Sequence, residues 1–276
     1  MSEGGSTPRR RFRLSGKDVY IYREVSSTNL VARSMAADGA HSDTVIMAAF
    51  QNAGVGRMQR PWVCPAGSGI TMSMILNPDI NLSSIPLLSL LCGAVVAETV
   101  RDLTGCPAGL KWPNDVLVDG KKICGILAQG GVRKNACSYV ILGVGLNVNQ
   151  SPDEFPPEFR DFSTSLRMEL GERVSRIRAL KRFFELWDMH YAEFSRSGSA
   201  YIRERWLENN VTLGHTVRLH GDAPDSPIQD GVAVDISERG GLMLRLPSGD
   251  IKEFLAEELS LGRSHYAPRK VERNTK

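Results

Sequence analysis

The chain has 276 residues, of which 42% are hydrophobic and 24% are charged, as is typical of a soluble globular protein with a sizeable core. The net charge of +3 is too small to argue for nucleic-acid binding, and no apolar run is long enough to predict a transmembrane helix. The five cysteines are widely spaced and the five histidines are scattered, so neither a disulfide framework nor a metal site is expected. We therefore expect a cytoplasmic protein with no membrane or nucleic-acid partner.

The chain divides into three predicted regions. Residues 1–14 are polar and basic and lack the apolar centre of a secretory signal, which predicts a flexible basic tail. An organelle transit peptide is the alternative, and Glu3 together with the shortness of the segment argues against it. Residues 15–210 alternate strand and helix patterns and form the predicted main domain, and residues 211–276 form a separate C-terminal domain.

Strands and helices of the main domain follow from apolar runs and from capping residues. Apolar and β-branched runs predict strands at 19–22, 44–50, 70–76, 110–112, 116–118 and 139–146. Helices are predicted from about 28 to 38, from Pro86 to the stop at Gly105, from the cap at Ser175 to Phe194, and over 199–207. The last long helix carries a hydrophobic stripe that we interpret as core: Ile177, Leu180, Phe183, Phe184, Trp187, Tyr191 and Phe194.

The C-terminal region has a different pattern. Short strands are predicted at 217–219, 231–236, 242–246 and 251–254, separated by glycine-containing turns. This spacing indicates a small all-β barrel, so the expected fold class is α+β with an appended barrel.

Residues 51–69 are too rich in glycine and proline for regular structure, and they predict a long functional loop. Gly54 and Gly56 allow the backbone to present N–H groups to an anion. Arg57 and Arg60 supply planar, multidentate contacts to phosphate. Taken alone, the pattern also fits a surface loop with stray arginines.

The segment 111–115 reads Lys-Trp-Pro-Asn-Asp, and it is followed by a turn, a lysine pair and Gly125. A lysine such as Lys122 can neutralise a carboxylate and a phosphate together, and so let two anions approach each other. Asp115 could hold a ribose hydroxyl, an amine or a metal-bound water. For the lysine pair alone, a solvated hairpin is the alternative interpretation.

A third element, Gly-Val-Gly-Leu-Asn at 143–147, ends the predicted strand at 139–146. Glycines there allow close approach of a ligand, and an asparagine can hold a ribose or phosphate. With the other elements in this order, the chain resembles the bacterial biotin protein ligases over roughly residues 18–262. The matching segments are Ser27-Thr28-Asn29, the glycine-arginine loop, 111–115, Lys122 with 125–127, 143–149 and Thr164-Ser165-Leu166.

The resemblance implies a fold and an activity. The fold is a mixed-sheet, class II synthetase-like biotin/lipoate ligase domain with a small C-terminal SH3-like barrel. The implied substrates are ATP and biotin, with Mg²⁺ accompanying the ATP, and the implied partner is a biotin carboxyl carrier protein of acetyl-CoA carboxylase. A homodimer is compatible with exposed strand edges. The short segment before the first strand indicates the monofunctional kind of ligase, without a DNA-binding domain.

The resemblance also implies roles for individual residues. Lys122, Asp115 and Arg57 are the implied catalytic residues, with Lys122 as the central contact to the biotin carboxylate and the phosphate. Ser27, Thr28 and Gln51 match positions that bind the biotin ureido ring, and Trp62 matches the ring that closes over the adenylate. The full implied binding set is Ser27, Thr28, Asn29, Gln51, Gly54, Gly56, Arg60, Trp62, Lys111, Asn114, Gly125, Gly143, Gly145 and Asn147.

Two departures from the family pattern bear on the site. The family loop usually reads Gly-Arg-Gly-Arg, but Val55 takes the place of the first arginine, and Thr71 stands where some relatives have a tyrosine. Three alternatives stay open: a lipoate or octanoate–protein ligase, a non-catalytic biotin or nucleotide binder, and a DNA-binding repressor. The double-arginine, triple-glycine pattern and the histidine-aspartate pair expected for the lipoate branch are not found.

Overall fold

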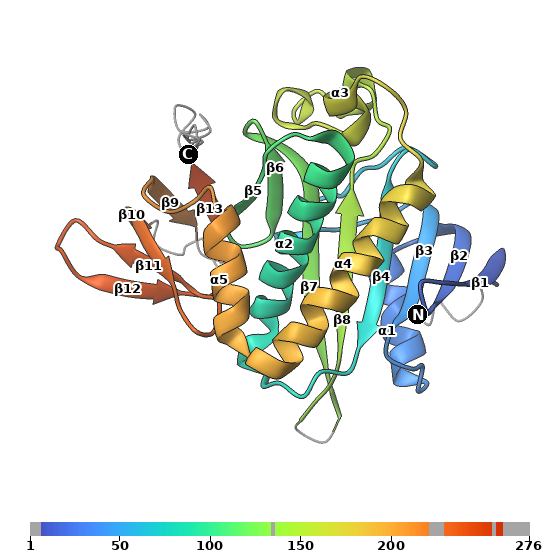
Figure 1. Cartoon of the computed structure of the whole chain (residues 1–276), viewed down its shortest axis with the longest axis horizontal. Helices are drawn as coiled ribbons and strands as arrows, with labels where there is room; N and C mark the ends of the chain where they lie inside the picture. Colours follow the sequence, from blue (N-terminus) through green and yellow to red (C-terminus); the bar gives the residue numbers. More distant parts are fainter. Residues whose placement is uncertain (1–6, 134–135, 221–228, 256–257, 262–276) are drawn as a thin grey trace, which may run out of the picture.

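A computed structural model describes residues 7–133, 136–220, 229–255 and 258–261 of the chain (Figure 1). Its core is an eight-stranded mixed sheet in the order β1-β2-β3-β4-β8-β7-β6-β5. β2 and β3 pair in parallel, and the other neighbours in this sheet pair antiparallel. The strands are β1 (Arg10–Leu14), β2 (Lys17–Val25), β3 (Thr44–Gln51), β4 (Ile70–Leu76), β5 (Ala108–Lys111), β6 (Asp115–Val118), β7 (Lys121–Arg133) and β8 (Ala136–Leu146).

Helices cover the two faces of this sheet unequally. The α-helices are α1 (Thr28–Ala37), α2 (Ile85–Thr104), α3 (Leu166–Leu170), α4 (Arg176–Ser197) and α5 (Ser199–Asn209). α2 is apolar on most sides and packs on one face together with α4, in the larger hydrophobic cluster. The short helix α1 packs on the opposite face, against β3, β4 and β8. The face that carries α1 is therefore the one with space left beside a helix.

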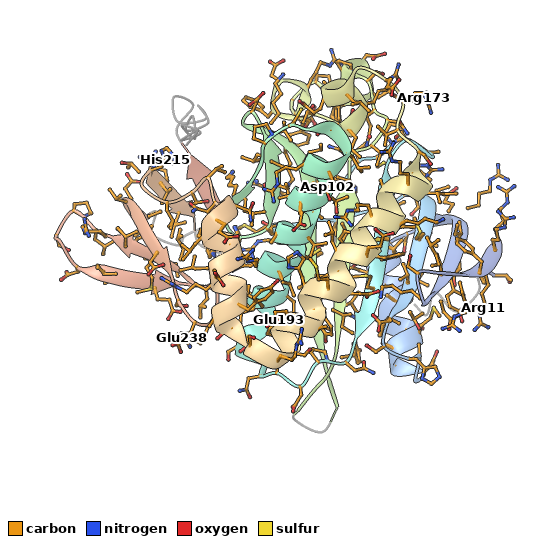
Figure 2. The ribbon with its side chains drawn as sticks, in the orientation of Figure 1. Arg11, Asp102, Arg173, Glu193, His215 and Glu238 are labelled. Atoms are coloured by element: carbon orange, nitrogen blue, oxygen red, sulfur yellow. The ribbon has the colours of Figure 1, made fainter. Side chains whose placement is uncertain are left out.

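The alternation of side chains along the strands explains this division, because successive residues of a strand point to opposite faces. Val45 belongs to the cluster with α2, whereas Ile46 belongs to the cluster with α1. A salt bridge reinforces the α2 side, where Arg182 of α4 donates to Asp102 near the end of α2 at 2.7 Å. Figure 2 labels Asp102 on α2.

A second, five-stranded antiparallel sheet follows α5 and confirms the predicted all-β end of the chain. Its strands are β9 (Thr216–His220), β10 (Gln229–Ile236), β11 (Leu242–Arg245), β12 (Ile251–Phe254) and β13 (Glu258–Leu261). In Figure 1, α5 lies between α2 and this small sheet. Arg203 of α5 donates to both carboxylate oxygens of Asp235 in β10 at 2.6 Å, which ties the helix to the sheet.

Most predicted elements are confirmed, and four expectations need correction. Arg10–Leu14 was expected in a flexible tail, but it pairs with β2 as the edge strand β1. β7 and β13 were not predicted as strands. Ile177 was expected in the buried stripe of α4, but it is 62% exposed. The division of the chain at residue 210 stays a prediction, and part of the predicted tail, residues 1–6, lies outside the described residues.

Candidate active site

A cavity of about 180 Å³ lies on the face of the large sheet that carries α1. Its walls come from the start of α1, the end of β3, the loop after β3, the β5–β6 turn, and the middle strands β4, β7 and β8. Residues far apart in the sequence meet here. Of the predicted site residues, the cavity is lined by Ser27, Thr28, Asn29, Gln51, Gly56, Arg57, Arg60, Trp62, Lys111, Asn114, Asp115, Lys122, Gly125, Gly143 and Gly145.

The floor of the cavity consists of small residues on alternate strand positions. Gly143 and Gly145 of β8 lie opposite Ser73 and Thr71 of β4. A Cβ atom added at Gly145 would overlap the indole of Trp62, so only glycine lets that ring lie directly on the sheet. The same strands place apolar side chains on the opposite face, where α2 packs. One strand pair therefore serves both the core and the cavity.

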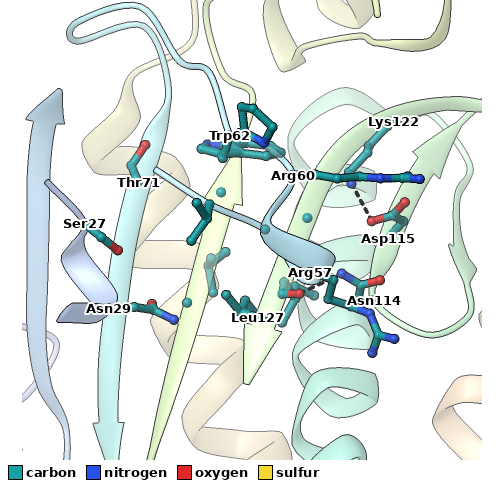
Figure 3. A pocket seen from close by; sticks show the side chains of 18 of the residues that line it. Ser27, Asn29, Arg57, Arg60, Trp62, Thr71, Asn114, Asp115, Lys122 and Leu127 are labelled. Atoms are coloured by element: carbon teal, nitrogen blue, oxygen red, sulfur yellow. Dashed lines mark hydrogen bonds and ion pairs between the residues drawn. The ribbon is translucent and has the colours of Figure 1, made fainter. Parts of the chain in front are cut away.

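One end of the cavity is polar and carries no formal charge. The backbone N–H of Thr28 and its hydroxyl both donate to Gln51 Oε1, at 2.7 and 3.0 Å. Figure 3 shows Ser27, Asn29 and Thr71 together at this end. Thr28 and Asn29 are buried, so their polar groups are held in fixed positions. This end is suited to a neutral ligand group that has both hydrogen-bond donors and acceptors.

The other end of the cavity is charged. Lys122 Nζ lies 2.6 Å from Asp115 Oδ1, and both side chains are partly buried (Figure 3). The same ammonium group lies 5.8 Å from the centre of the Trp62 ring, within cation–π range. Asn114 fixes the turn that carries Asp115, because its Nδ2 donates to Ile126 O at 2.8 Å. The arrangement places a partly buried cation beside a ring and a carboxylate.

The loop after β3 folds back on itself over the cavity. Trp62 N donates to Gly54 O at 2.9 Å, and Gly56 N donates to Arg60 O at 2.8 Å. Between these bonds lies a single 3₁₀ turn, Arg57–Gln59. Figure 3 shows Arg57 and Arg60 on the same side of the cavity as Lys122 and Asp115. The predicted irregular loop is confirmed, and its arginines concentrate positive charge at one end.

The comparisons with known proteins agree with this geometry. A sequence model of the "Biotin/lipoate A/B protein ligase family" matches residues 20–147. The chain is 35% identical over 246 residues to the "Bifunctional ligase/repressor BirA" of Bacillus subtilis, an alignment that covers 88% of this chain and 74% of the relative. It is 34% identical over 230 residues to the "Biotin--[acetyl-CoA-carboxylase] ligase" of Mycobacterium tuberculosis, covering 81% and 82%.

The chain belongs to the biotin protein ligases. A crystallised relative, the biotin protein ligase from Aquifex aeolicus in complex with biotin and ATP, superposes with a TM-score of 0.75 at 29% identity. That superposition covers 91% of this chain and 100% of the relative. The mixed sheet, the covering helices and the small C-terminal sheet are thus those of a biotin protein ligase.

Two residues in the set implied by the biotin protein ligase resemblance lie outside the cavity wall. Gly54 lies at the base of the loop, where its carbonyl accepts from Trp62. Asn147 is buried, and its Nδ2 donates to Thr164 O at 3.0 Å while its Oδ1 accepts from Gln150 at 3.0 Å. Asn147 thus helps to hold the 163–165 segment beside Lys122, and its contact with the adenylate stays a prediction.

Several residues of the ligase site were not recognised in the sequence. Leu127 and Met58 line the cavity, and Ser73 lies directly behind Thr28 and Asn29. The available signal was the two-residue period Thr-x-Ser in β4 and Gly-x-Leu in β7, which places Ser73 and Leu127 on the face of Gly143 and Gly145. For Leu127, using this signal requires knowing that 121–133 is a strand.

A buried cysteine beside the charged end of this ligase site is not a nucleophile. Burial raises the pKa of the Cys124 thiol, although Lys122 acts in the opposite direction. The neutral thiol is the form present at physiological pH, and it is a weak nucleophile. Among the described residues, no group of three or more His, Cys, Asp or Glu side chains could hold a metal ion. Likewise, none of the described helices is long and apolar enough to cross a membrane.

Proposed function

We propose that this protein activates biotin with ATP to form biotinyl-5′-AMP, and then transfers the biotinyl group to a lysine of a biotin carboxyl carrier protein. The observation that carries the proposal is one cavity with a neutral polar end and a cationic end, joined by a glycine floor. The first end suits the ureido ring of biotin, and the second suits a carboxylate that meets a triphosphate. The named relatives, which include a biotin–[acetyl-CoA-carboxylase] ligase, support the same acceptor.

In the first step, a biotin carboxylate oxygen attacks the α-phosphorus of ATP, and the bond to the pyrophosphate oxygen breaks. Both reactants are anions, so their approach is opposed by Coulomb repulsion. Lys122 is the proposed residue that offsets this repulsion and stabilises the charge on the transferred group. Arg57 and Arg60, on the same side of the cavity, are proposed to contact the phosphates.

In the second step, the amine of the acceptor lysine attacks the biotinyl carbonyl carbon, an amide bond forms, and AMP leaves. The attacking amine must lose its proton. Asp115 is proposed to bind this amine and to accept its proton, because it is the carboxylate among the residues lining the cavity and it lies in an ion pair with Lys122. Trp62 is proposed to shield the mixed anhydride from water, since its ring lies across the floor.

The cavity suits Mg²⁺ only when the ion is bound to the phosphates of ATP, and not as a separate protein-bound metal. Asp115 is the one carboxylate among the described cavity residues, and it is paired with Lys122. Mg²⁺ retains several waters and binds readily to nucleotide phosphates with few protein ligands. The metal would neutralise phosphate charge there, and we assign no protein ligand to it.

Biotin fits the polar end better than lipoate does. The dithiolane ring of lipoate has no strong hydrogen-bonding group, so it would give no hydrogen bond to the buried Thr28 or the partly buried Gln51. The ureido ring of biotin offers one carbonyl acceptor and two N–H donors to the same groups.

We also propose that the protein acts in the cytoplasm, and that the edge strand β1 is available for association into a homodimer.

The test is biotin-dependent exchange between ATP and pyrophosphate, followed by transfer to a purified carrier domain. We expect exchange with biotin but not with lipoate or octanoate, and stoichiometric labelling of one carrier lysine. Exchange that requires lipoate would favour the second branch of the family. Biotin binding without any exchange would contradict the proposal and support a non-catalytic binder.

A further inference from the structure

Five polar side chains form a continuous hydrogen-bonded series that begins at Gln51 in the cavity wall and ends at Gln129 in β7. Thr28 donates to Gln51, and its hydroxyl lies 2.7 Å from Ser73 Oγ. Ser73 Oγ lies 2.6 Å from Asn29 Oδ1, and Asn29 Nδ2 donates to Gln129 Oε1 at 3.0 Å. Ser73 is fully buried, and Thr28 and Asn29 are nearly so. Gln129 does not line the cavity, and unlike Ser73, which also lies behind the lining residues, it is partly exposed.

The orientation of Gln129 fixes the orientation of the Asn29 amide. The Gln129 oxygen accepts from Asn29, so the Asn29 amide turns its own oxygen toward Ser73. That oxygen can only accept, so it competes with Thr28 Oγ1 for the single hydroxyl proton of Ser73. The Thr28 hydroxyl proton itself is donated to Gln51 Oε1.

The Asn29 amide cannot evade this constraint by moving. A Cβ atom added at Gly143 would overlap Asn29 Oδ1, so the amide lies directly against the backbone of β8. Figure 3 shows Asn29 directed from the start of α1 across the sheet. The only inexpensive change left to the amide is a half-turn that exchanges its oxygen and nitrogen. Such a half-turn would present a donor to Ser73 and leave the Ser73 hydroxyl proton to Thr28 alone.

A ureido ring needs a defined pattern of partners, with a donor for its carbonyl and acceptors for its N–H groups. Gln51 lines the cavity, and because its oxygen accepts from Thr28, its remaining polar atom is the Nε2 donor. Thr28 and Asn29 also line the cavity. Their donor and acceptor roles toward a ligand depend on which protons the buried series has already used.

We infer that Gln129 is a positioning residue for the biotin head group, which acts through Asn29 and Ser73 to set the hydrogen-bond polarity of the cavity. This inference rests on the proposed function, because it concerns the ureido ring of the same substrate. Gln129 is not a catalytic residue, since it lies behind Asn29 and outside the cavity wall. Its side-chain oxygen is the feature that matters, and its amide nitrogen is dispensable.

Two substitutions separate these features. Gln129→Met keeps the length of the side chain and removes the acceptor, whereas Gln129→Glu keeps an acceptor oxygen. For Gln129→Met we expect the KM for biotin to rise roughly five- to tenfold, as for loss of a buried hydrogen bond. The KM for ATP and kcat should stay within about twofold, and Gln129→Glu should restore the biotin KM. Calorimetric titration with biotin gives the same comparison without turnover.

A probe of reversed polarity sharpens the test. In 2-iminobiotin an imine N–H donor replaces the carbonyl acceptor. Wild type should discriminate against it strongly, and Gln129→Met should reduce that discrimination, because the Asn29 amide is then able to turn. Gln229→Met in β10 is the matched control for a glutamine-to-methionine change on a strand remote from the cavity.

Each outcome decides the inference. An unchanged biotin KM in Gln129→Met, or an equal loss in Gln129→Met and Gln129→Glu, would overturn it while leaving the proposed function intact. Equal increases in the KM values of biotin and ATP would indicate a general structural role and would also overturn it. Wild-type protein without biotin-dependent exchange would overturn the proposed function, and the positioning role with it.

Discussion

Lys121 and Lys122 are neighbours in the chain, but they face different surroundings. Lys122 lines the cavity and pairs with Asp115, whereas Lys121 is exposed and lies outside the cavity wall. This difference depends on the register of β6 and β7. The pairing of these strands shifts by one residue between Val116 and Leu117, next to the lysine pair. Spacing and resemblance were enough to select Lys122 in the sequence, but the ion pair with Asp115 required the registry of the two strands.

The two lysines form a matched pair for mutagenesis. Lys122→Ala removes the charge that is proposed to offset the repulsion between carboxylate and phosphate, so we expect kcat for exchange to fall roughly 10²–10³-fold. Lys121→Ala removes the same charge from the exposed neighbouring position and should leave kcat within about twofold. Steady-state exchange kinetics check both. Retained activity in Lys122→Ala would contradict its assigned role.

Val55 is the residue at which the loop departs from the family pattern. It lines the cavity, is 37% exposed, and forms an isolated bridge with Pro61. Val55→Arg would add a cation to the end of the cavity that is proposed to bind the phosphates, and we expect the dissociation of biotinyl-5′-AMP to slow roughly tenfold, the effect of one charge-assisted hydrogen bond. Release of the adenylate can be followed by stopped-flow fluorescence.

The control for Val55→Arg is Val63→Arg, which adds the same charge to an exposed position just beyond Trp62 and outside the cavity wall. It should leave the release rate unchanged. A similar effect of both substitutions would point to the net charge of the loop. If neither changed the rate, the missing family arginine would have no bearing on adenylate retention.

At the scale of elements, apolar strands were predicted from the sequence, whereas polar strands that form through pairing with neighbouring strands were missed. β4 is buried along its full length, and its predicted bounds are confirmed. β7 carries lysines, glycines and a glutamine, and it is a strand because it pairs with β6 and β8. β1 is arginine-rich and lies at the sheet edge, where β2 is its one pairing partner among the described strands. Local propensity cannot reveal pairing between distant segments.

The same argument applies to the cavity floor, where β8 was predicted but its contact with Trp62 was not. Gly145→Ala would push the indole off the sheet, and overpacking of this kind costs about 1–3 kcal/mol. Because Trp62 sits on a surface loop, we expect the loop to open while the core stays folded. The measurable result is faster hydrolysis of bound biotinyl-5′-AMP with a thermal unfolding midpoint close to that of wild type. Unchanged hydrolysis would show that Trp62 does not shield the anhydride.

At the scale of the whole molecule, Trp112 joins the site to the C-terminal sheet. It is 1% exposed, its Nε1 donates to Gly240 O at 2.9 Å, and its backbone N donates to Thr212 Oγ1 at 2.9 Å. Gly240 lies in the turn between β10 and β11, which packs against Leu87 and Leu90 of α2. The tryptophan of the Lys-Trp-Pro-Asn-Asp motif thus holds the two sheets together, a role that the sequence did not indicate.

Trp112→Phe tests this connection. It removes the bond to Gly240 and leaves that carbonyl unpaired, which costs about 1–3 kcal/mol in addition to the lost volume. Trp187→Phe is the matched control, because Trp187 is equally buried and its Nε1 has no hydrogen-bond partner among the described residues. Denaturant unfolding should show the larger loss for Trp112→Phe. Equal losses would mean that the bond to Gly240 contributes nothing.

The stability of the turn that accepts the hydrogen bond of Trp112 should depend on pH. The Ser237 hydroxyl donates to Glu253 in β12, and this bond, with a further contribution from Arg239, lowers the pKa of the Glu253 carboxyl below its ordinary value of 4.5. A carboxylate with a lowered pKa in the folded state stabilises the protein above its unfolded pKa, and that stabilisation is lost as the pH falls through the folded pKa. Because Glu253 and Arg239 are partly exposed, the effect should be about 0.5–1 kcal/mol.

We therefore expect Glu253→Gln to be less stable than wild type at pH 7, and the difference to shrink as the pH is lowered past the folded pKa of Glu253. Glu238→Gln is a control in the same turn, since Glu238 is exposed. Unfolding free energies measured along a pH series would decide this. A difference that persists at low pH would assign the loss to the shape of the glutamine rather than to the charge. If the difference disappears when Glu253 is protonated, acid should destabilise the turn around Gly240 first. The hydrogen bond from Trp112 to Gly240, which joins the C-terminal sheet to the site, should weaken with it.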